Sequence, residues 1–219
     1  MEALRSEDPR CIPRGHGFMI TDRSHSHMRI GVFGGSFDPP HNGHIGIATH
    51  AARQLGLDRT ILIPSAVPPH KLDRDLSSPK DRLAMCELAV AGVPGLSVSD
   101  VELRREGVSY TVDTLLDLRG MFPGSELFML IGMDNYHEFH LWRDPDRILE
   151  LATVIVMDRP GYRTRGIEPG AGPRIRRVEV PQIDVSSTQI RRLVSSGEPI
   201  SGLVPRAVEE YIDQRRLYR

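Results

Sequence analysis

Residues 29–44 constrain the fold of this chain more than any other stretch. A short apolar run breaks at Gly34 and Gly35, and a helical pattern begins a few residues later, with His41 and His44 at its start. A strand, a tight loop and a helix N-terminus in this order gather unpaired backbone N–H groups and the positive end of a helix dipole at one point. Such a point binds a phosphate group, so the stretch predicts an anion site.

The composition excludes several classes of protein. The 219 residues suffice for one large domain, or for one domain with an appendage, and for a sizeable core. The formal net charge of −1 offers no basic field for nucleic acid, and 39% hydrophobic with 26% charged residues is typical of a globular protein. No apolar run approaches the ~20 residues of a membrane-spanning helix. Cys11 and Cys86 lie far apart, which indicates neither a disulfide framework nor a zinc site. We therefore expect a reduced, cytoplasmic protein with no nucleic-acid or membrane partner.

The first 27 residues differ from the rest of the chain. They are rich in Arg, Ser, His, Pro and Gly and show no apolar periodicity. We expect residues 1–27 to be a disordered extension, with Met28 as an alternative start. Residues 28–219 are then a single domain, in which residues 181–219 form a C-terminal helical part.

Apolar periodicity beyond this extension alternates between strand and helix. After the first strand it predicts strands at 60–64, 96–103 (with a bend), 126–131, 153–157 and 177–180. It predicts helices at 42–55, 78–90, 112–119, 136–142, 145–151, 189–194 and 205–212. This rhythm indicates the α/β class, with an open, doubly wound parallel sheet and right-handed crossovers. Ligands of such sheets bind outside the carboxyl ends of the strands, where the loops after the first, second and fourth strands would meet.

Two longer segments interrupt this rhythm. Residues 65–77 are polar and proline-rich and too long for a minimal strand-to-helix connection, so they are a candidate functional loop. Residues 158–174 are rich in Gly, Pro and Arg and are the best candidate for a mobile linker or lid. Gly56 after the first helix, and Ser78 with Pro79 before the second, are typical of a C-terminal and an N-terminal cap.

The loop at residues 34–44 is not one of the common nucleotide-binding loops. Its glycines do not form G-x-G-x-x-G, which disfavours a dehydrogenase, and it lacks the Gly-Lys-Ser/Thr of a Walker loop. His41 and His44 instead lie three positions apart on the first helical turn, with the small Gly43 leaving room for a base or a phosphate. The same pair could hold a metal, although no third ligand lies nearby on this element, or could cap the helix.

Two motifs resemble those of the nucleotidyltransferase superfamily. Residues 34–44, Gly-Gly-Ser-Phe-Asp-Pro-Pro-His-Asn-Gly-His, resemble its H-x-G-H signature, and residues 186–191, Ser-Ser-Thr-Gln-Ile-Arg, resemble its C-terminal motif. Within the superfamily, residues 68–71, 108–115 and 131–142 are similar to bacterial nicotinate-nucleotide adenylyltransferases. The resemblance runs from about residue 28 to the C-terminus. It implies a Rossmann-like nucleotidyltransferase fold and an enzyme that transfers AMP from ATP to nicotinate mononucleotide in NAD biosynthesis, forming deamido-NAD and pyrophosphate.

The resemblance also implies direct, in-line attack without a covalent enzyme intermediate. The attacking group is already an anionic phosphate, so catalysis rests on alignment and charge stabilisation rather than on a general base. Mg²⁺ would be held by the ATP phosphates, with no metal ligand from the protein. The implied catalytic residues are His41, His44, Lys71 and Arg191.

The implied binding residues divide between the two substrates. Trp142 would stack on the nicotinate ring, and Thr111 would position its carboxylate. Arg143 matches no family pattern and is included because its positive charge would suit that carboxylate. The ATP-binding residues would be Gly34, Gly35, Ser36, Phe37, His41, His44, Gly132, Asp134, Ser186, Ser187, Thr188 and Arg191. The nicotinate-nucleotide residues would be Ser36, Lys71, Thr111, Trp142 and Arg143.

Simpler interpretations and other functions stay open at this point. Residues 186–188 also suit an ordinary N-cap, Lys71 a solvated loop lysine, Asp134 a helix cap and Trp142 a core residue. Phosphopantetheine adenylyltransferase shares both phosphate motifs, but it is a shorter chain and lacks the other signals. A nucleotide-binding sensor would keep the phosphate cradle without turnover. The sequence leaves open the oligomeric state and the degree of selectivity for the acid over the amide mononucleotide.

Overall fold

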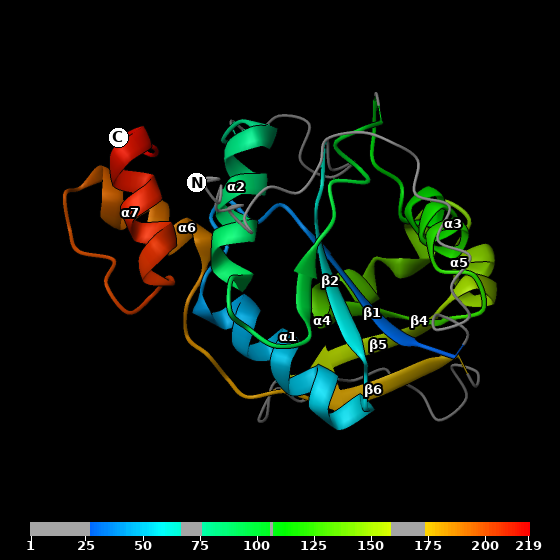
Figure 1. Cartoon of the computed structure of the whole chain (residues 1–219). Coiled ribbons are helices and arrows are strands. Elements are labelled where there is room, and N and C mark those ends of the chain that lie inside the picture. Colours follow the sequence, from blue (N-terminus) through cyan, green and yellow to red (C-terminus); the bar gives the residue numbers. More distant parts are fainter. Residues whose placement is uncertain (1–26, 67–75, 106, 159–173) are drawn as a thin grey trace, which may run out of the picture.

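The computed structural model describes residues 27–66, 76–105, 107–158 and 174–219, and its centre is a six-stranded sheet. Neighbouring strands are all parallel, in the order β3-β2-β1-β4-β5-β6 (Figure 1). The strands are β1 (Arg29–Gly35), β2 (Arg59–Pro64), β3 (Leu96–Val98), β4 (Glu126–Gly132), β5 (Thr153–Asp158) and β6 (Ile175–Glu179).

The strand order reverses beside β1. The chain moves outward from β1 through β2 to β3, returns to the other side of β1, and moves outward again through β4, β5 and β6. The ladder between β1 and β4 ends at the pair Val32 and Met129, before either strand ends. A crevice therefore opens at the carboxyl ends of these two strands, which is where open α/β sheets bind ligands. The predicted α/β class and open, doubly wound parallel sheet are confirmed.

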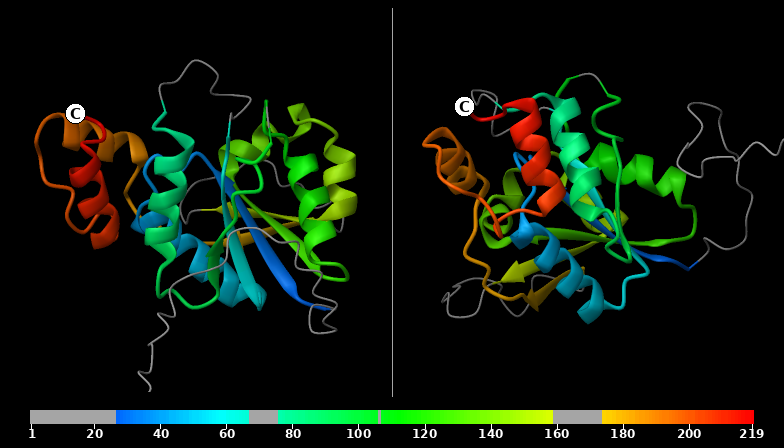
Figure 2. Two further views of the ribbon diagram at one scale, coloured as in Figure 1. Left: turned by 45° about the horizontal axis from the view of Figure 1, so that its top comes forward. Right: turned by 60° about the vertical axis from the view of Figure 1, so that its left-hand side comes forward.

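Helices cover both faces of the sheet (Figures 1 and 2). α1 and α2 lie over the face of the sheet on which Leu62 is buried. α3 and α5 lie over the opposite face, on which Ile61 and Ile63 are buried. Because successive strand residues alternate between faces, a strand buried on both sides is apolar throughout. The helices are α1 (Asn42–Leu55), α2 (Pro79–Val90), α3 (Thr111–Met121), α4 (Met133–His137), the 3₁₀ helix η3 (Phe139–Leu141), α5 (Pro145–Leu151), α6 (Ser187–Ser195) and α7 (Arg206–Arg215).

The two C-terminal helices form a layer beyond α2. Figure 2 shows α6 and α7 at one side of the molecule, next to α2. Ile190 of α6 and Val208 and Ile212 of α7 are buried in one apolar cluster with Met85 of α2. This packing places the C-terminal motif, at the start of α6, near the first motif. The division of the chain into an extension, a domain and a C-terminal part stays a prediction.

Predicted bounds agree best with the structure where local capping signals were strong. α1 spans the predicted 42–55, and Gly56 caps it in the left-handed conformation (φ 59°), donating its N–H toward the carbonyl of Ala52. α2 begins after Ser78, whose side chain accepts the backbone N–H of Asp81. Both predicted caps are confirmed. They were predictable because a cap depends only on residues that are neighbours in sequence.

The predicted strand at 96–103 is wrong in length. β3 ends at Val98, and turns follow it. Ser99 Oγ accepts the backbone N–H of Val101, and a side chain that bonds to the nearby backbone competes with the strand ladder. Residues 101–103, at the end of the predicted strand, therefore form a turn.

The predicted helix at 136–142 is wrong in form. α4 starts earlier, at Met133, and η3 follows as a separate short turn of helix. Gly132 is the N-cap of α4, and Asp134 lies inside its first turn, so Asp134 does not cap this helix. Helical elements this short fall below the length over which apolar periodicity can be detected.

Three predicted features fall outside the described residues. They are all but the last residue of the N-terminal extension, the part of the 65–77 loop that carries Lys71, and the 158–174 segment except for its two end residues. Within the described part of the chain, no helix is long and apolar enough to cross a bilayer.

Candidate active site

His41 and His44 cap α1 reciprocally. His41 is the N-cap residue, and its Nδ1 accepts the backbone N–H of His44 at 3.3 Å. His44 Nδ1 in turn accepts the backbone N–H of His41 at 3.2 Å, and the two rings stack with centroids 3.6 Å apart. A ring nitrogen that accepts an N–H carries no hydrogen, so Nε2 is the donor of each neutral ring. The sequence left open that the two histidines cap the helix. In the structure they do, and the cap orients the Nε2–H group of each ring.

The loop before α1 is held by close packing. Phe37 has a left-handed backbone (φ 48°), which is uncommon for an aromatic residue, and its buried ring lies edge-on to His44 with centroids 5.0 Å apart. A Cβ at Gly43 would lie 2.9 Å from Val185 Cγ1 and 3.0 Å from His41 Nδ1. The space predicted to admit a base or a phosphate is instead filled by Val185, the residue just before the C-terminal motif.

The start of α6 docks on the same loop. Ser187 Oγ donates to the carbonyl of Pro39 at 2.9 Å. Arg191 Nη1, one turn further along, donates to the carbonyl of Asp38 at 2.8 Å. The N-terminal ends of α1 and α6 therefore lie beside one loop, and the positive ends of both helices can act on one anion.

A cavity of about 540 Å³ lies at this junction, and we call it the phosphate-side cavity. Its lining combines backbone of the glycine pair with an imidazole, hydroxyls and a guanidinium, all of which bind phosphate. His41 lies behind His44 and is 6% exposed. The predicted ATP-binding residues that line the cavity are Gly34, Gly35, Ser36, Phe37, His44, Ser187, Thr188 and Arg191.

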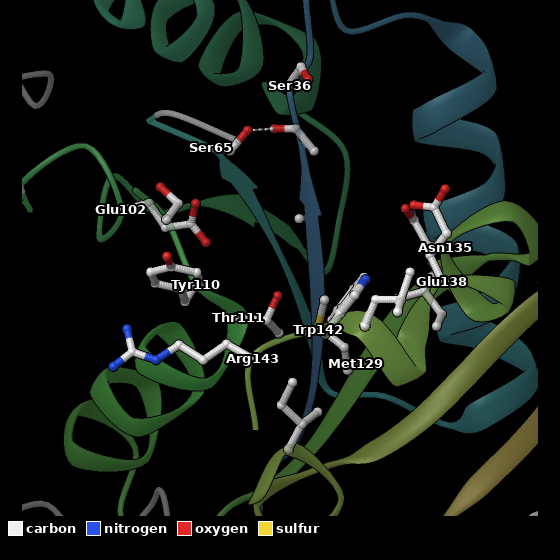
Figure 3. A pocket seen from close by; sticks show the side chains of 16 residues that line it. Ser36, Ser65, Glu102, Tyr110, Thr111, Met129, Asn135, Glu138, Trp142 and Arg143 are labelled. Atoms are coloured by element: carbon white, nitrogen blue, oxygen red, sulfur yellow. Dashed lines mark hydrogen bonds between the residues drawn. The ribbon is translucent and has the colours of Figure 1, made fainter. Parts of the chain in front are cut away.

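A second cavity, of about 340 Å³, lies beside the first, and we call it the ring-side cavity. Figure 3 shows Tyr110 and Arg143 on one side of it, Asn135 and Glu138 on the other, and Trp142 between them. Its lining is part aromatic, which suits a flat ring. The predicted nicotinate-nucleotide residues that line it are Ser36, Thr111, Trp142 and Arg143.

The two cavities share a wall. Gly34, Gly35, Ser36 and Asn135 line both of them. Gly34 and Gly35 end β1, Ser36 follows it, and Asn135 lies in α4 just after β4. The shared wall therefore lies in the crevice where the two strands diverge. Ligands bound on the two sides would meet there, and the arrangement is suited to moving a phosphoryl-type group from one ligand to the other.

Comparison with known proteins identifies the family. Residues 32–193 match the cytidylyltransferase-like family. A relative from Thermus thermophilus, named probable nicotinate-nucleotide adenylyltransferase, is 44% identical over 192 residues, which are 88% of this chain and 100% of the relative. The chain belongs to the nicotinate-nucleotide adenylyltransferase family. A family member of the same name from Geobacillus thermodenitrificans is 40% identical, over 87% of this chain and 86% of its own length.

A solved structure agrees with the fold of this family member. The nicotinic acid mononucleotide adenylyltransferase of Plasmodium falciparum, complexed with NaAD, superposes with a TM-score of 0.74 at 17% identity. The match covers 88% of this chain and 98% of the other. At that identity the likeness concerns the fold, and the Rossmann-like nucleotidyltransferase fold is confirmed.

Arg82 supports both cavities and was not predicted from the sequence. Its guanidinium is 1% exposed and donates to the carbonyls of Ser36, Ala66 and Ser77. These carbonyls belong to the loops after β1 and β2 and to the segment before α2. Burial lowers the pKa of Arg82, and the charge of Asp38 opposes this effect, so the guanidinium stays a donor. The sequence signal that could have indicated a buried arginine is its position on the apolar face of α2, with Met85, Cys86 and Ala89.

Glu102 lines the ring-side cavity and was also missed. It is 7% exposed, and Thr114 Oγ1 donates to its Oε1 at 2.7 Å. Burial raises the pKa of Glu102, while hydrogen bonds from Thr114 and Ser109 act in the opposite direction. Ser109 Oγ also accepts the backbone N–H of Ala66 at 3.1 Å. Glu102 thus ties the loop after β2 to the start of α3, and it was missed because its stretch was predicted as strand.

Several predicted ATP-binding residues line neither cavity. Gly132 and Asp134 lie at the start of α4, where Asp134 is exposed. Ser186 is the N-cap of α6, and its side chain accepts the backbone N–H of Gln189 at 3.2 Å, which is the ordinary capping role. Lys71 lies outside the described residues.

The donors around the phosphate-side cavity suit phosphate oxygens rather than a bare cation. They are mostly N–H and guanidinium groups, which have no lone pair to offer a metal ion. Asp38 also lines this cavity, but its carboxylate already accepts hydrogen bonds from Tyr218 and Ser77. In the described ranges, no group of three or more His, Cys, Asp or Glu side chains is placed to hold a metal.

Proposed function

We propose that this chain transfers AMP from ATP to nicotinate mononucleotide, releasing pyrophosphate and forming deamido-NAD for NAD biosynthesis. The observation that carries the proposal is the junction of two cavities, one lined by phosphate-binding groups and the other partly aromatic. The names of relatives that align over almost the whole described chain support the same substrates.

The reaction joins the two substrates directly. A phosphate oxygen of nicotinate mononucleotide attacks the α-phosphorus of ATP, the bond from that phosphorus to the bridging oxygen breaks, and pyrophosphate leaves with the bond electrons. The attacking oxygen is already anionic, so the protein has to align the two groups and stabilise charge. We assign the α-phosphate to the shared wall, because both nucleotides can meet there.

His44 stabilises the charge that builds on the α-phosphate. Its ring lines the phosphate-side cavity, and Nε2 is its donor because Nδ1 accepts the backbone N–H of His41. His41 stacks on this ring and acts as a second donor from a more buried position. Lys71 belongs to the same predicted catalytic set, and its contribution stays a prediction.

Residues at the start of α6 hold the β- and γ-phosphates. Arg191 binds the carbonyl of Asp38 through Nη1, and its Nη2 lies 3.3 Å from Thr188 Oγ1. A guanidinium held in this way loses less conformational freedom when it binds phosphate. The first backbone N–H groups of α6, including that of Ser187, complete the clamp, while the Ser187 hydroxyl donates to Pro39. The family resemblance assigns Gly132 and Asp134 to the ATP ribose.

The ring-side cavity takes the nicotinate nucleotide. Trp142 offers an aromatic face, and its buried indole Nε1 has no hydrogen-bond partner in the described part of the chain. Thr111 starts α3, whose N-cap Tyr110 makes no side-chain cap bond, so the first backbone N–H groups of α3 suit a carboxylate. The Arg143 guanidinium lies over the Tyr110 ring at 4.6 Å and 3.8 Å from Asp113. It therefore adds positive charge that Asp113 partly balances.

We further propose Mg²⁺ as the divalent metal, carried by the ATP phosphates. The residues around the phosphate-side cavity fit this arrangement, since they bind phosphate oxygens and leave the ion to the nucleotide and water. When bound, Mg²⁺ neutralises part of the phosphate charge.

Product identification tests the proposal. The full chain is incubated with ATP and Mg²⁺ and, separately, with nicotinate mononucleotide, nicotinamide mononucleotide or phosphopantetheine, and products are identified by mass spectrometry. We expect deamido-NAD and pyrophosphate from the first acceptor, loss of turnover with EDTA, and recovery with added Mg²⁺. Adenylated phosphopantetheine would identify the rival enzyme. ATP binding without pyrophosphate release from any acceptor would identify a nucleotide sensor.

A further inference from the structure

We propose that Tyr218 is a positioning residue that holds the loop of residues 36–40 in its ATP-binding form through Asp38. The inference rests on the proposed function. Tyr218 lies far from the motifs in sequence, and its hydroxyl donates to Asp38 Oδ1 at 2.7 Å. Asp38 belongs to the first motif and lines the phosphate-side cavity. The tail of the chain thus reaches the wall of the proposed ATP site.

The chain after α7 turns sharply to bring Tyr218 to this position. Arg216 and Tyr218 both have left-handed backbone (φ 52° and 64°), and Leu217 donates its N–H to the carbonyl of Ile212. The right-hand view of Figure 2 shows α7 alongside α2, with the C-terminal end of α7 next to the first residues of α2. The Tyr218 hydroxyl also lies 3.9 Å from Met85 Sδ of α2. Two residues in an unfavourable conformation indicate that tertiary contacts determine the path of this tail.

Asp38 is the point at which three segments meet. Its side chain is 1% exposed, with Oδ1 accepting from Tyr218 and Oδ2 accepting the backbone N–H of Ser77 at 3.3 Å. Its carbonyl accepts Nη1 of Arg191 at 2.8 Å. Asp38 therefore links the first motif to the C-terminal motif, to the segment before α2 and to the tail. A shift of its side chain would move the backbone that Arg191 and α6 share with it.

The hydroxyl of Tyr218 keeps its proton and so remains a hydrogen-bond donor. Burial and the nearby charge of Asp38 raise the pKa of Tyr218 well above its usual range, so the hydroxyl stays protonated at neutral pH. Without this donor, Oδ1 of a buried carboxylate loses its bond, which is costly for a charged group. The loop can relieve that cost by moving Asp38 toward water in the adjacent cavity, at the expense of the phosphate site.

The test compares two tyrosines of the C-terminal region. Tyr218→Phe keeps the ring and removes the bond to Asp38. Tyr211→Phe is the matched control, because its hydroxyl donates to Asp81 of α2 at 2.9 Å and not to the loop. We expect Tyr218→Phe to raise KM for ATP about tenfold and to weaken binding of a non-hydrolysable ATP analogue equally, the scale of one hydrogen bond to a charged group. KM for nicotinate mononucleotide should change less than KM for ATP, since Ser36 alone of this loop lines the ring-side cavity, and Tyr211→Phe should keep both KM values.

A double-mutant cycle with Asp38→Ala, which removes both acceptor oxygens, establishes whether Tyr218 acts through Asp38. The double variant should bind the ATP analogue no more weakly than Asp38→Ala alone, because the bond is lost once. Additive losses, or lower thermal stability of Tyr218→Phe with unchanged affinity for the analogue, would overturn the proposal. If Tyr218→Phe does not fold, unchanged ATP affinity in Asp38→Ala overturns it as well. Turnover of the wild-type chain tests the proposed function separately, since analogue binding needs no acceptor.

Discussion

Replacing His44 separates its role in capping α1 from its role in catalysis. His44→Asn places Oδ1 three bonds from Cα, the same distance along the side chain as Nδ1 of histidine, and so keeps an acceptor for the backbone N–H of His41 at 3.2 Å. It lacks an atom in the place of Nε2. His44→Ala removes both the acceptor and the donor, and also the ring stacked at 3.6 Å on His41.

The expected effects differ in kind and in size. Loss of a donor to a transition-state oxyanion costs ~2.7–4 kcal/mol, so both variants should lower kcat by about 10²- to 10³-fold. Loss of the cap costs about 1 kcal/mol of folding stability. In a chain of this length that lowers Tm by roughly 2–4 °C. His44→Ala should show this loss, and His44→Asn should melt close to the wild type.

Pyrophosphate release at saturating substrates and thermal unfolding measure the two effects. A kcat of His44→Asn less than about tenfold below wild type would refute the assignment of Nε2 as the transition-state donor. A rise in KM for ATP alone would assign His44 to ground-state binding instead. Equal Tm values for His44→Ala and His44→Asn would refute the reciprocal cap.

Three further predictions follow from the site. Gly43→Ala places a Cβ 3.0 Å from His41 Nδ1, so kcat should fall about 10–100-fold. Gly120→Ala should keep activity, because among the described residues its Cβ would meet no atom within 4 Å beyond its own helix backbone and chain neighbours, and equal kcat values for the two variants would contradict the packing argument. Burial raises the pKa of Glu102, so the folded protein favours the protonated carboxyl. The contribution of Glu102 to folding stability therefore declines as the pH rises above 4.5, the ordinary pKa of this group. Urea unfolding should therefore show Glu102→Gln gaining stability relative to wild type from about pH 4 to about pH 7, and a constant difference would exclude the effect. Arg143→Ala should weaken selectivity for nicotinate over nicotinamide mononucleotide, and an unchanged ratio of kcat/KM values would rule out its role.

Local chemistry made much of the fold predictable. The bounds of α1 follow from a helical apolar face and Gly56, and the start of α2 follows from Ser78 and Pro79. β2 is recognisable because a central parallel strand is apolar on both faces. These signals need only the residues of one element, and they carried over to the structure almost unchanged.

The sequence was misleading where side chains bond to their own backbone or where an element is short. Ser99 turns the chain out of β3, and the brief α4 places Asp134 inside the helix rather than at its cap. Arg82 and Glu102 were missed because a buried charge is determined by its partners, and these partners lie on other elements.

Taken alone, the sequence determined the class of sheet, the strand-loop-helix at residues 29–44 and, through two motifs, the family. The tertiary structure alone decided which groups meet at the loop. Asp38 accepts hydrogen bonds from Ser77, Arg191 and Tyr218, which lie 39, 153 and 180 positions away. Contacts of such separation leave no periodicity in the sequence, since they arise from how packed elements approach one another. The space beside Gly43 likewise holds Val185 only because α6 docks there.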